Sequence, residues 1–233
     1  MKNPFRFSIL PYFTIGAGGL GLCLQLWLHA GTDEKGLLPA SHPATVIVFI
    51  LTALVFAILY LATREVCLPS CSRNFRRMAE GIGSLAGAAS LLLHTLSGNQ
   101  GLLNLAVGAA GCVLLLWWAL LAFQKKPLPY GLGAAVTVVL MVGTVTQCRS
   151  WGSVPQIQQY FFPLLASLFL ILTAYHRTTL AAKHGKRVTL AFFSQGALFL
   201  CCVAAGTNPV LYLGMGCWAA AQLLPCYRTK KEN

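Results

Sequence analysis

Residues 49–64 read FILTALVFAILYLATR, an apolar stretch that ends at a single arginine. Residues 162–177 read FPLLASLFLILTAYHR and align with the first stretch without a gap. With their flanks, both stretches reach the roughly 20 apolar residues that a helix needs to cross a bilayer. An internal match between two such segments indicates a duplicated bundle of membrane-spanning helices. Seven aligned positions are identical, namely Phe49/Phe162, Leu51/Leu164, Ala53/Ala166, Phe56/Phe169, Ile58/Ile171, Leu59/Leu172 and Arg64/Arg177.

The composition of the whole chain also indicates a membrane protein. Of its 233 residues, 57% are hydrophobic and only 9% are charged, a balance unlike that of a soluble domain. We predict an all-α integral membrane protein, because helices satisfy their own backbone hydrogen bonds within hydrocarbon. Almost no sequence remains for a soluble part, so residues 1–233 are expected to form a single membrane domain. Eight segments are predicted to be transmembrane helices, approximately residues 8–30, 43–63, 78–97, 102–123, 128–147, 157–177, 187–206 and 209–226.

The internal match divides the chain into a first repeat, residues 1–124, and a second repeat, residues 125–233. The tripeptide Leu-Pro-Tyr at residues 10–12 recurs at residues 128–130. Each repeat carries four spans, an even number, so the second repeat enters the membrane with the same orientation as the first. The sequence therefore predicts two parallel four-helix repeats, and solutes of transport proteins commonly bind at the interface of such repeats.

Basic residues are distributed unevenly between the predicted loops. The chain has 17 Lys and Arg residues against five Asp and Glu residues, a formal net charge of +12. All the basic residues except Lys35 and Arg149 fall on the side of the N-terminus. The positive-inside rule makes this side cytoplasmic, which predicts a cell (inner) membrane protein with both termini in the cytoplasm. The charge is then expected to face anionic lipids rather than nucleic acid.

Ionisable side chains within membrane spans often mark coupling or ion sites, and this chain has few of them. The middles of the eight predicted spans contain no Asp, Glu, Lys or Arg. Glu80 comes nearest, about one helical turn after Arg76 and Arg77. An interfacial ion pair with these neighbours is the expected role of Glu80, and a proton-coupling site is the alternative.

Sequence motifs of known catalytic chemistry are missing from the chain. It contains no G-x-S-x-G, H-E-x-x-H or Walker sequence, so an enzyme is not the favoured class and no cofactor is expected. Cys67 and Cys71 have a spacing that suits a metal, but no second pair of ligands lies nearby in sequence. Structural zinc normally takes four ligands, so no metal site is predicted.

Two amides fall well inside the predicted spans. Gln195 and Gln222 approach the middle of the membrane in the last two segments. If they face one another they would line a polar cavity suited to a neutral or zwitterionic solute. The alternative is a hydrogen-bonded contact between helices, which is the commoner role of such residues.

A dense polar cluster is predicted at the outer rim. Asp33 and Glu34 lie in the first outer loop, His29 precedes it, and His94 emerges on the same side. Arg149, from the corresponding region of the second repeat, would reach these acids as an ion pair or contact a ligand. Histidine beside carboxylate would also suit a divalent metal or a pH-sensitive gate.

The outer segment at residues 33–38, Asp-Glu-Lys-Gly-Leu-Leu, is followed by His42 and Pro43. This segment resembles one in small bacterial multi-spanning membrane proteins of unknown function. The resemblance covers chiefly the first two spans. It implies a bacterial cytoplasmic membrane and no activity.

These features favour a transport-type or small-solute-binding membrane protein with its site between the two repeats. One alternative is a non-catalytic accessory or scaffold subunit that binds a membrane protein partner. A further alternative is a lipid-headgroup enzyme at the outer rim, with histidine and carboxylate as acid and base. The candidate ligand-binding residues are Gln195, Gln222, Arg149, Asp33, Glu34, His29 and His94.

Overall fold

The computed structural model describes residues 5–31, 42–64, 70–97, 102–151, 160–226 and 228–229. Apart from two two-residue strands and a short 3₁₀ turn, the regular structure of these residues is α-helical, so the all-α prediction is confirmed. The helices are α1 (Phe5–Ala30), α2 (Pro43–Arg64), α3 (Arg73–Ser97), α4 (Leu102–Phe123), α5 (Tyr130–Trp151), α6 (Phe161–Ala181), α7 (Arg187–Ala204) and α8 (Pro209–Ala221). The remaining elements are β1 (Ser70–Cys71), β2 (Arg228–Thr229) and the 3₁₀ turn η2 (Leu224–Cys226).

Seven of the described helices are long and apolar enough to cross a membrane, namely α1, α2 and α4 to α8, with α8 counted through to Cys226. The 22 residues of α4, for example, measure about 33 Å against about 30 Å of hydrocarbon. Their outer faces carry large exposed apolar side chains such as Leu61 and Leu120. A soluble protein of this size would not expose such a surface, so this is a multi-pass helical membrane protein.

Helix α3 is the described helix outside that set of seven. Its first two turns carry Arg73, Arg76, Arg77 and Glu80, and its remainder is rich in glycine, alanine and serine, which lowers its hydropathy. With 25 residues it is nevertheless long enough to span, and it packs closely on both α4 and α8. Eight passages through the membrane therefore stay the prediction.

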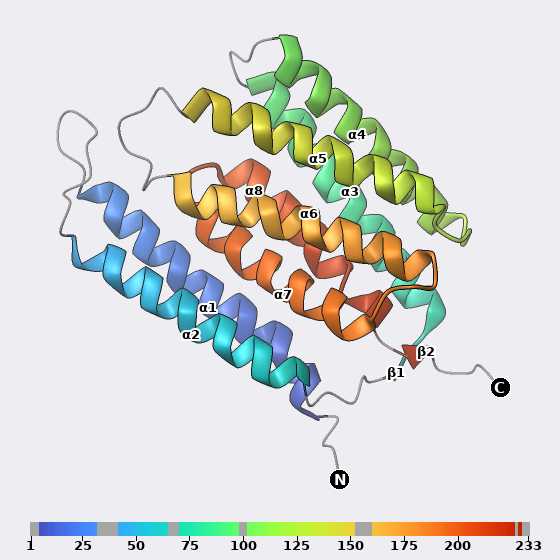
Figure 1. Ribbon diagram of the computed structural model, residues 1–233, viewed down its shortest axis with the longest axis horizontal. Coiled ribbons are helices and arrows are strands. Elements are labelled where there is room, and N and C mark those ends of the chain that lie inside the picture. The colour runs from blue at the N-terminus through green and yellow to red at the C-terminus, as the bar shows by residue number, and fades with distance from the viewer. Residues whose placement is uncertain are drawn as a thin grey trace.

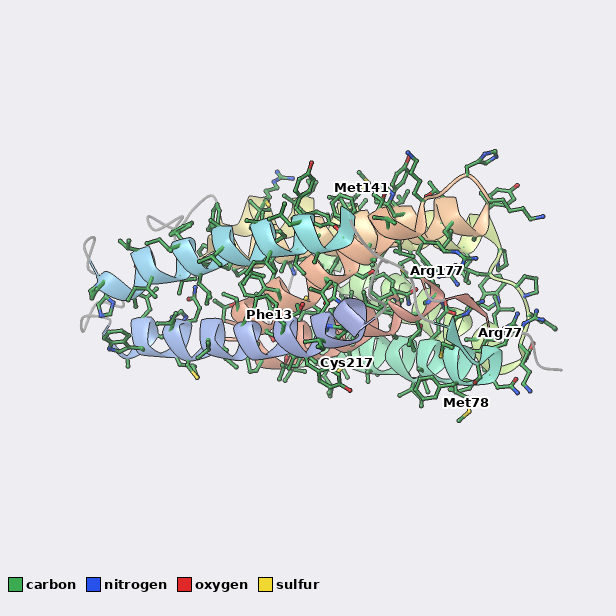
Figure 2. The ribbon with its side chains drawn as sticks, turned by 90° about the horizontal axis from the view of Figure 1, so that it is seen from below. Phe13, Arg77, Met78, Met141, Arg177 and Cys217 are labelled. Carbon is green, nitrogen blue, oxygen red and sulfur yellow. The ribbon has the colours of Figure 1, made fainter. Side chains whose placement is uncertain are left out.

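The helices run alternately up and down, and their axes lie side by side in one slanted bundle (Figure 1). The start of α1 and the end of α8 lie at the same end of this bundle. Arg77 and Arg177, far apart in sequence, also lie together at one end (Figure 2). We call this the basic end. The short parallel pair of β1 and β2 is located there and joins the chain before α3 to the chain after η2.

Helix α7 forms the centre of the bundle. It packs against α1, α2, α6 and α8, and two-thirds of its residues are buried. Phe199, Leu200 and Cys201 are inaccessible to solvent. A second packing group joins α3 to α4 and α8.

Small residues allow several helices to approach closely, as the sequence indicates. A Cβ atom on Gly83 would overlap Ala221 and lie 3.0 Å from the carbonyl oxygen of Cys217 in α8. Gly18 and Gly21 meet Cys202 and Val203 of α7 in the same way. These glycines therefore form helix-packing faces.

The end of α8 differs from the expected span. The helix stops at Ala221, five residues before the predicted end at residue 226, and η2 follows. Pro225 explains the difference, because proline lacks the backbone donor of a continuing helix and disfavours the helical conformation of the residue before it. Gln222 is thus the C-cap of α8 rather than an interior residue.

Two of the aligned aromatic pairs lie against one another. The ring centroids of Phe49 and Phe162 are 5.4 Å apart, and those of Phe56 and Phe169 are 4.9 Å apart. Helices α2 and α6 therefore run in the same direction and meet through these rings, although their backbones share at most a marginal contact. If a two-fold axis related the two repeats, α3 would correspond to α7 and α4 to α8. The extensive packing of α3 on α8 would then be matched between α7 and α4, but these two helices share at most a marginal contact. The duplication of four-helix repeats stays a prediction.

Candidate functional site

A buried ion pair lies at the basic end of the bundle. Glu80 of α3 is 5% exposed, and its Oε1 is 2.6 Å from Nη2 and 3.1 Å from Nε of Arg177. The indole Nε1 of Trp118 in α4 donates a third hydrogen bond to the same oxygen, at 3.2 Å. An ion pair of Glu80 was expected, but with its helical neighbours Arg76 and Arg77. The described partner instead comes from α6, 97 residues along the chain.

Small residues bring these three side chains together. Gly81 follows Glu80 and leaves space for the ring of Phe123 from α4, which a Cβ atom at this position would contact at 2.8 Å. Gly83 and Gly87 let α8 approach the other side of α3. Arg177 lies in the last turns of α6, at the level where α3 begins. The ion pair thus connects the first half of the chain with the second.

Further cations surround the pair and line a cavity of about 190 Å³, which we call the basic cavity. Arg76 and Arg77 contribute from α3, Arg177 from α6, and Lys126 from the turn between α4 and α5. Arg187, at the start of α7, is close enough to act electrostatically on Arg76. Glu80 is the only carboxylate among the described lining residues, so positive charge is in excess.

Two guanidinium nitrogens near this cavity are left without partners. Nε of Arg76 and Nη1 of Arg77 are buried and have no hydrogen-bond partner among the described residues. Burial lowers the pKa of Arg76 from its usual value, opposed by Glu80 and reinforced by Arg177. Burial also lowers the pKa of Arg77, with the positive charge of Arg73 as the next cause. A guanidinium stays protonated at neutral pH, so each of these two nitrogens carries a hydrogen that it can donate.

The turn after α4 directs Lys126 toward the cavity. Lys125 has a left-handed backbone conformation with φ of 57°, which is unusual for a residue other than glycine. The backbone N–H of Lys125 donates to Ala122, and that of Lys126 donates to Leu121 at 3.0 Å. This is the Schellman arrangement, which reverses the chain directly after a helix. It places Lys126 at the edge of the basic cavity.

The two predicted intramembrane amides do not line any described cavity. Gln195 and Gln222 are completely buried, and neither amide has a hydrogen-bond partner among the described residues. In the antiparallel register of α7 and α8, Gly216 meets Cys201, which puts Gln195 and Gln222 at the same level. The two amides lie at the same depth, as expected, but they are packed among other side chains and do not line a polar cavity among those described.

The predicted outer-rim residues are spread over several elements. Asp33 and Glu34 lie outside the described residues. His29 belongs to α1, which packs on α2 and α7, whereas His94 belongs to α3, which packs on α4 and α8. Nδ1 of His94 lies 2.8 Å from Nδ2 of Asn208, and Arg149 lines a groove between α4 and α5. Within the described part of the chain, no three His, Cys, Asp or Glu residues lie together as metal ligands would.

Arg177 and Trp118 are the site residues that sequence reasoning missed. In the sequence, Arg177 stands out only as the end of the second aligned stretch, and Trp118 carries no signal of a role in a site. The sequence does indicate that Glu80 has a cationic partner. Glu80 is the acid nearest to a span and therefore needs a partner that shields it from lipid. Which cation provides that shielding depends on helix neighbours that the sequence does not reveal.

The chain was compared with protein-family models, curated proteins and solved structures, and none of them matches it. Any role of the basic cavity therefore has to be inferred from its own residues.

Proposed function

We propose that the protein is a membrane protein of the solute-binding or transport type, and that its ligand is a small anion with phosphate or carboxylate oxygens. The observation that carries this proposal is the basic cavity, where four cationic side chains face a single carboxylate. Oxyanions are the ligands that clustered guanidinium groups recognise best, because planar N–H donors match their paired oxygens.

The charge distribution favours an anion over the neutral or zwitterionic solute suggested by the two glutamines. Oε1 of Glu80 already accepts three hydrogen bonds from Arg177 and Trp118. Arg76 and Arg77 each retain a buried nitrogen without a partner. Leaving a buried donor unsatisfied costs about 1–3 kcal/mol, and an anion that accepted these hydrogen bonds would remove the cost.

The position of the cavity agrees with a site between the two halves of the chain. Arg76, Arg77 and Glu80 belong to the first half, whereas Lys126 and Arg177 belong to the second. When Arg77 is aligned with Arg187 and Ser84 with Ser194, the repeat alignment pairs Glu80 with Leu190, which is apolar and buried. Even if the chain arose by duplication, the ion pair exists in a single copy, and so does the site.

The proposed direction of access follows from the positive-inside rule. The basic end carries most of the cations, so it faces the cytoplasm in the predicted topology. The ligand would enter from this side, because the cavity lies where α3 begins and α6 ends. Release to the other side would define a transporter, and retention would define a binding protein.

The test is the thermal stability of the purified protein in detergent, with inorganic phosphate, succinate or glycerol phosphate added at constant ionic strength. A ligand that binds the folded state raises the melting temperature by mass action. We expect at least one of these anions to stabilise the protein beyond chloride. We further expect Arg76→Gln to weaken this response about tenfold, equivalent to 1.4 kcal/mol.

The matched control is Lys183→Gln. Lys183 is exposed in the turn after α6 at the same end and does not line the cavity. It should keep the response of the unmodified protein. The proposal fails if none of the three anions exceeds chloride, or if Lys183→Gln and Arg76→Gln change the response equally.

A further inference from the structure

A second binding region lies toward the opposite end of the bundle from the basic cavity. Its inner part is a cavity of about 80 Å³ between α3, α4, α5, α6 and α8, which we call the neutral cavity. Most of its wall is apolar, and His94, Asn104 and Tyr212 are among its polar groups. The described lining residues include no Asp, Glu, Lys or Arg. Its chemistry therefore differs from that of the basic cavity.

The outer part of this region is a groove of about 530 Å³ between α4 and α5, which we call the α4–α5 groove. Leu103, Met141 and Val145 line it, and each is more than half exposed. Met141 lies on the outside of the bundle (Figure 2). Exposed apolar side chains on a membrane-spanning helix face the lipid tails, so the groove opens laterally into the bilayer.

The groove and the neutral cavity adjoin one another. Asn104 of α4 and Thr146 of α5 line both of them. Helices α4 and α5 also pack less extensively than α3 and α4 do. At Gly143 the contact between α4 and α5 is limited, since a Cβ atom there would meet only Val107, at the van der Waals distance of 3.5 Å.

A cation stands at one end of the groove. Arg149, in the last turn of α5, is exposed and lines the groove at the end of the bundle opposite to Lys126. In the sequence, only Lys35 and Arg149 of all the Lys and Arg residues are placed on that side of the membrane. The groove therefore pairs an apolar trough with one positive charge at the depth of the lipid headgroups.

We infer that the α4–α5 groove binds a single-chain lipid with an anionic headgroup. The headgroup contacts Arg149, and the acyl chain follows Val145 and Met141 and enters the neutral cavity past Asn104. The charge of Arg149 selects an anionic headgroup, and the narrow passage between α4 and α5 selects one chain rather than two. This inference uses neither the basic cavity nor its proposed ligand.

The experiment is photo-crosslinking in phosphatidylcholine nanodiscs with two probes that carry the same diazirine-bearing acyl chain. One probe is lysophosphatidylglycerol, which is anionic, and the other is lysophosphatidylcholine, which is zwitterionic. We expect the anionic probe to label peptides of α4 and α5 preferentially, as mapped by mass spectrometry. Arg149→Gln should reduce this preference about fivefold, because one interfacial cation is lost.

Val145→Trp supplies a second variant that fills the groove from outside without disturbing the core. Its control is Leu61→Trp on α2, because Val145 is 66% exposed and Leu61 is 63% exposed. Labelling should fall in Val145→Trp and persist in Leu61→Trp. Equal labelling by both probes, or equal labelling of the two tryptophan variants, would overturn the inference. Retention of the anionic preference in Arg149→Gln would overturn it as well.

Discussion

The indole rings of Trp118 and Trp218 meet edge to face, with ring centroids 5.9 Å apart and planes at 85°. Both side chains are buried, and they join α4 to α8 across the two halves of the chain. Nε1 of Trp118 donates to Glu80, whereas Nε1 of Trp218 has no hydrogen-bond partner among the described residues. Of these two rings in contact, Trp118 thus lines the basic cavity and donates a hydrogen bond there, whereas Trp218 does not line it.

This difference predicts unequal losses of stability for two equivalent substitutions. Trp118→Phe and Trp218→Phe lose similar ring area, but only Trp118→Phe removes a hydrogen bond to a charged acceptor, worth about 1.5–3 kcal/mol. Trp218→Phe removes a buried donor that lacks a partner, which offsets part of its packing loss. The free energy of unfolding in mixed micelles should therefore fall further for Trp118→Phe. A larger fall for Trp218→Phe would contradict the assigned hydrogen bonding.

Glu80→Gln is expected to lower stability and raise the response to phosphate. The amide leaves the buried guanidinium of Arg177 without its counter-charge, at a cost of about 3–5 kcal/mol. An added anion replaces that charge, so phosphate should raise the melting temperature of Glu80→Gln more than that of the unmodified protein. Lys183→Gln is the control, because Lys183 is exposed at the same end and does not line the cavity. If phosphate stabilised both variants equally, Glu80 would not be compensating the cavity cations.

Gly83→Ala should separate α3 from α8. The added methyl group would overlap Ala221, and overpacking of this kind costs about 1–3 kcal/mol. Gly16→Ala is the control, because a Cβ atom on Gly16 meets nothing within 4 Å. That substitution should be neutral or stabilise α1 by up to about 1 kcal/mol through helix propensity. Thermal unfolding followed by circular dichroism distinguishes the two, and a tolerated Gly83→Ala would mean that the helices do not touch there.

Gln195→Met and Gln222→Met test the earlier hypothesis of a polar cavity. Both amides are buried without described partners, so replacing them with an apolar side chain of similar length should be neutral or stabilising. Thr173→Val is the control for a satisfied group, since the Thr173 hydroxyl donates to the carbonyl oxygen of Phe169 at 2.8 Å. Stability is measured as the free energy of unfolding in mixed micelles. Destabilisation by more than about 1 kcal/mol in either glutamine variant would indicate a bound water or solute at these amides.

Much of the architecture follows from local sequence features. Apolar segment length defines the helices, and glycine spacing identifies faces such as Gly83 to Gly87 that contact a neighbour. The start of α3 is the exception to the prediction of helices from apolar length. Arg76, Arg77 and Glu80 lower its hydropathy, and they also line the basic cavity. The residues that make α3 the least apolar of the helices are the same residues that form the candidate site.

The identity of the site's partners did not follow from the sequence. Hydropathy places a segment in the membrane but does not specify which helices are adjacent, and lipid-facing and protein-facing surfaces are equally apolar. Arg177 therefore looked like any other cation at a helix end. For the same reason Gln195 and Gln222 could be placed at one depth, whereas the close packing around them could not be foreseen.

The two-residue ladder of β1 and β2 joins residues 228–229 to the segment that leads into α3. Ser70 and Cys71 pair with Arg228 and Thr229, and α3 begins two residues after Cys71. We expect tension applied behind Thr229 to reach the helix that carries Arg76, Arg77 and Glu80. A purification tag or antibody attached at the C-terminus would pull on this strand pair and so on the start of α3. Affinities measured on such a fusion would reflect this distortion as well as the binding of the ligand.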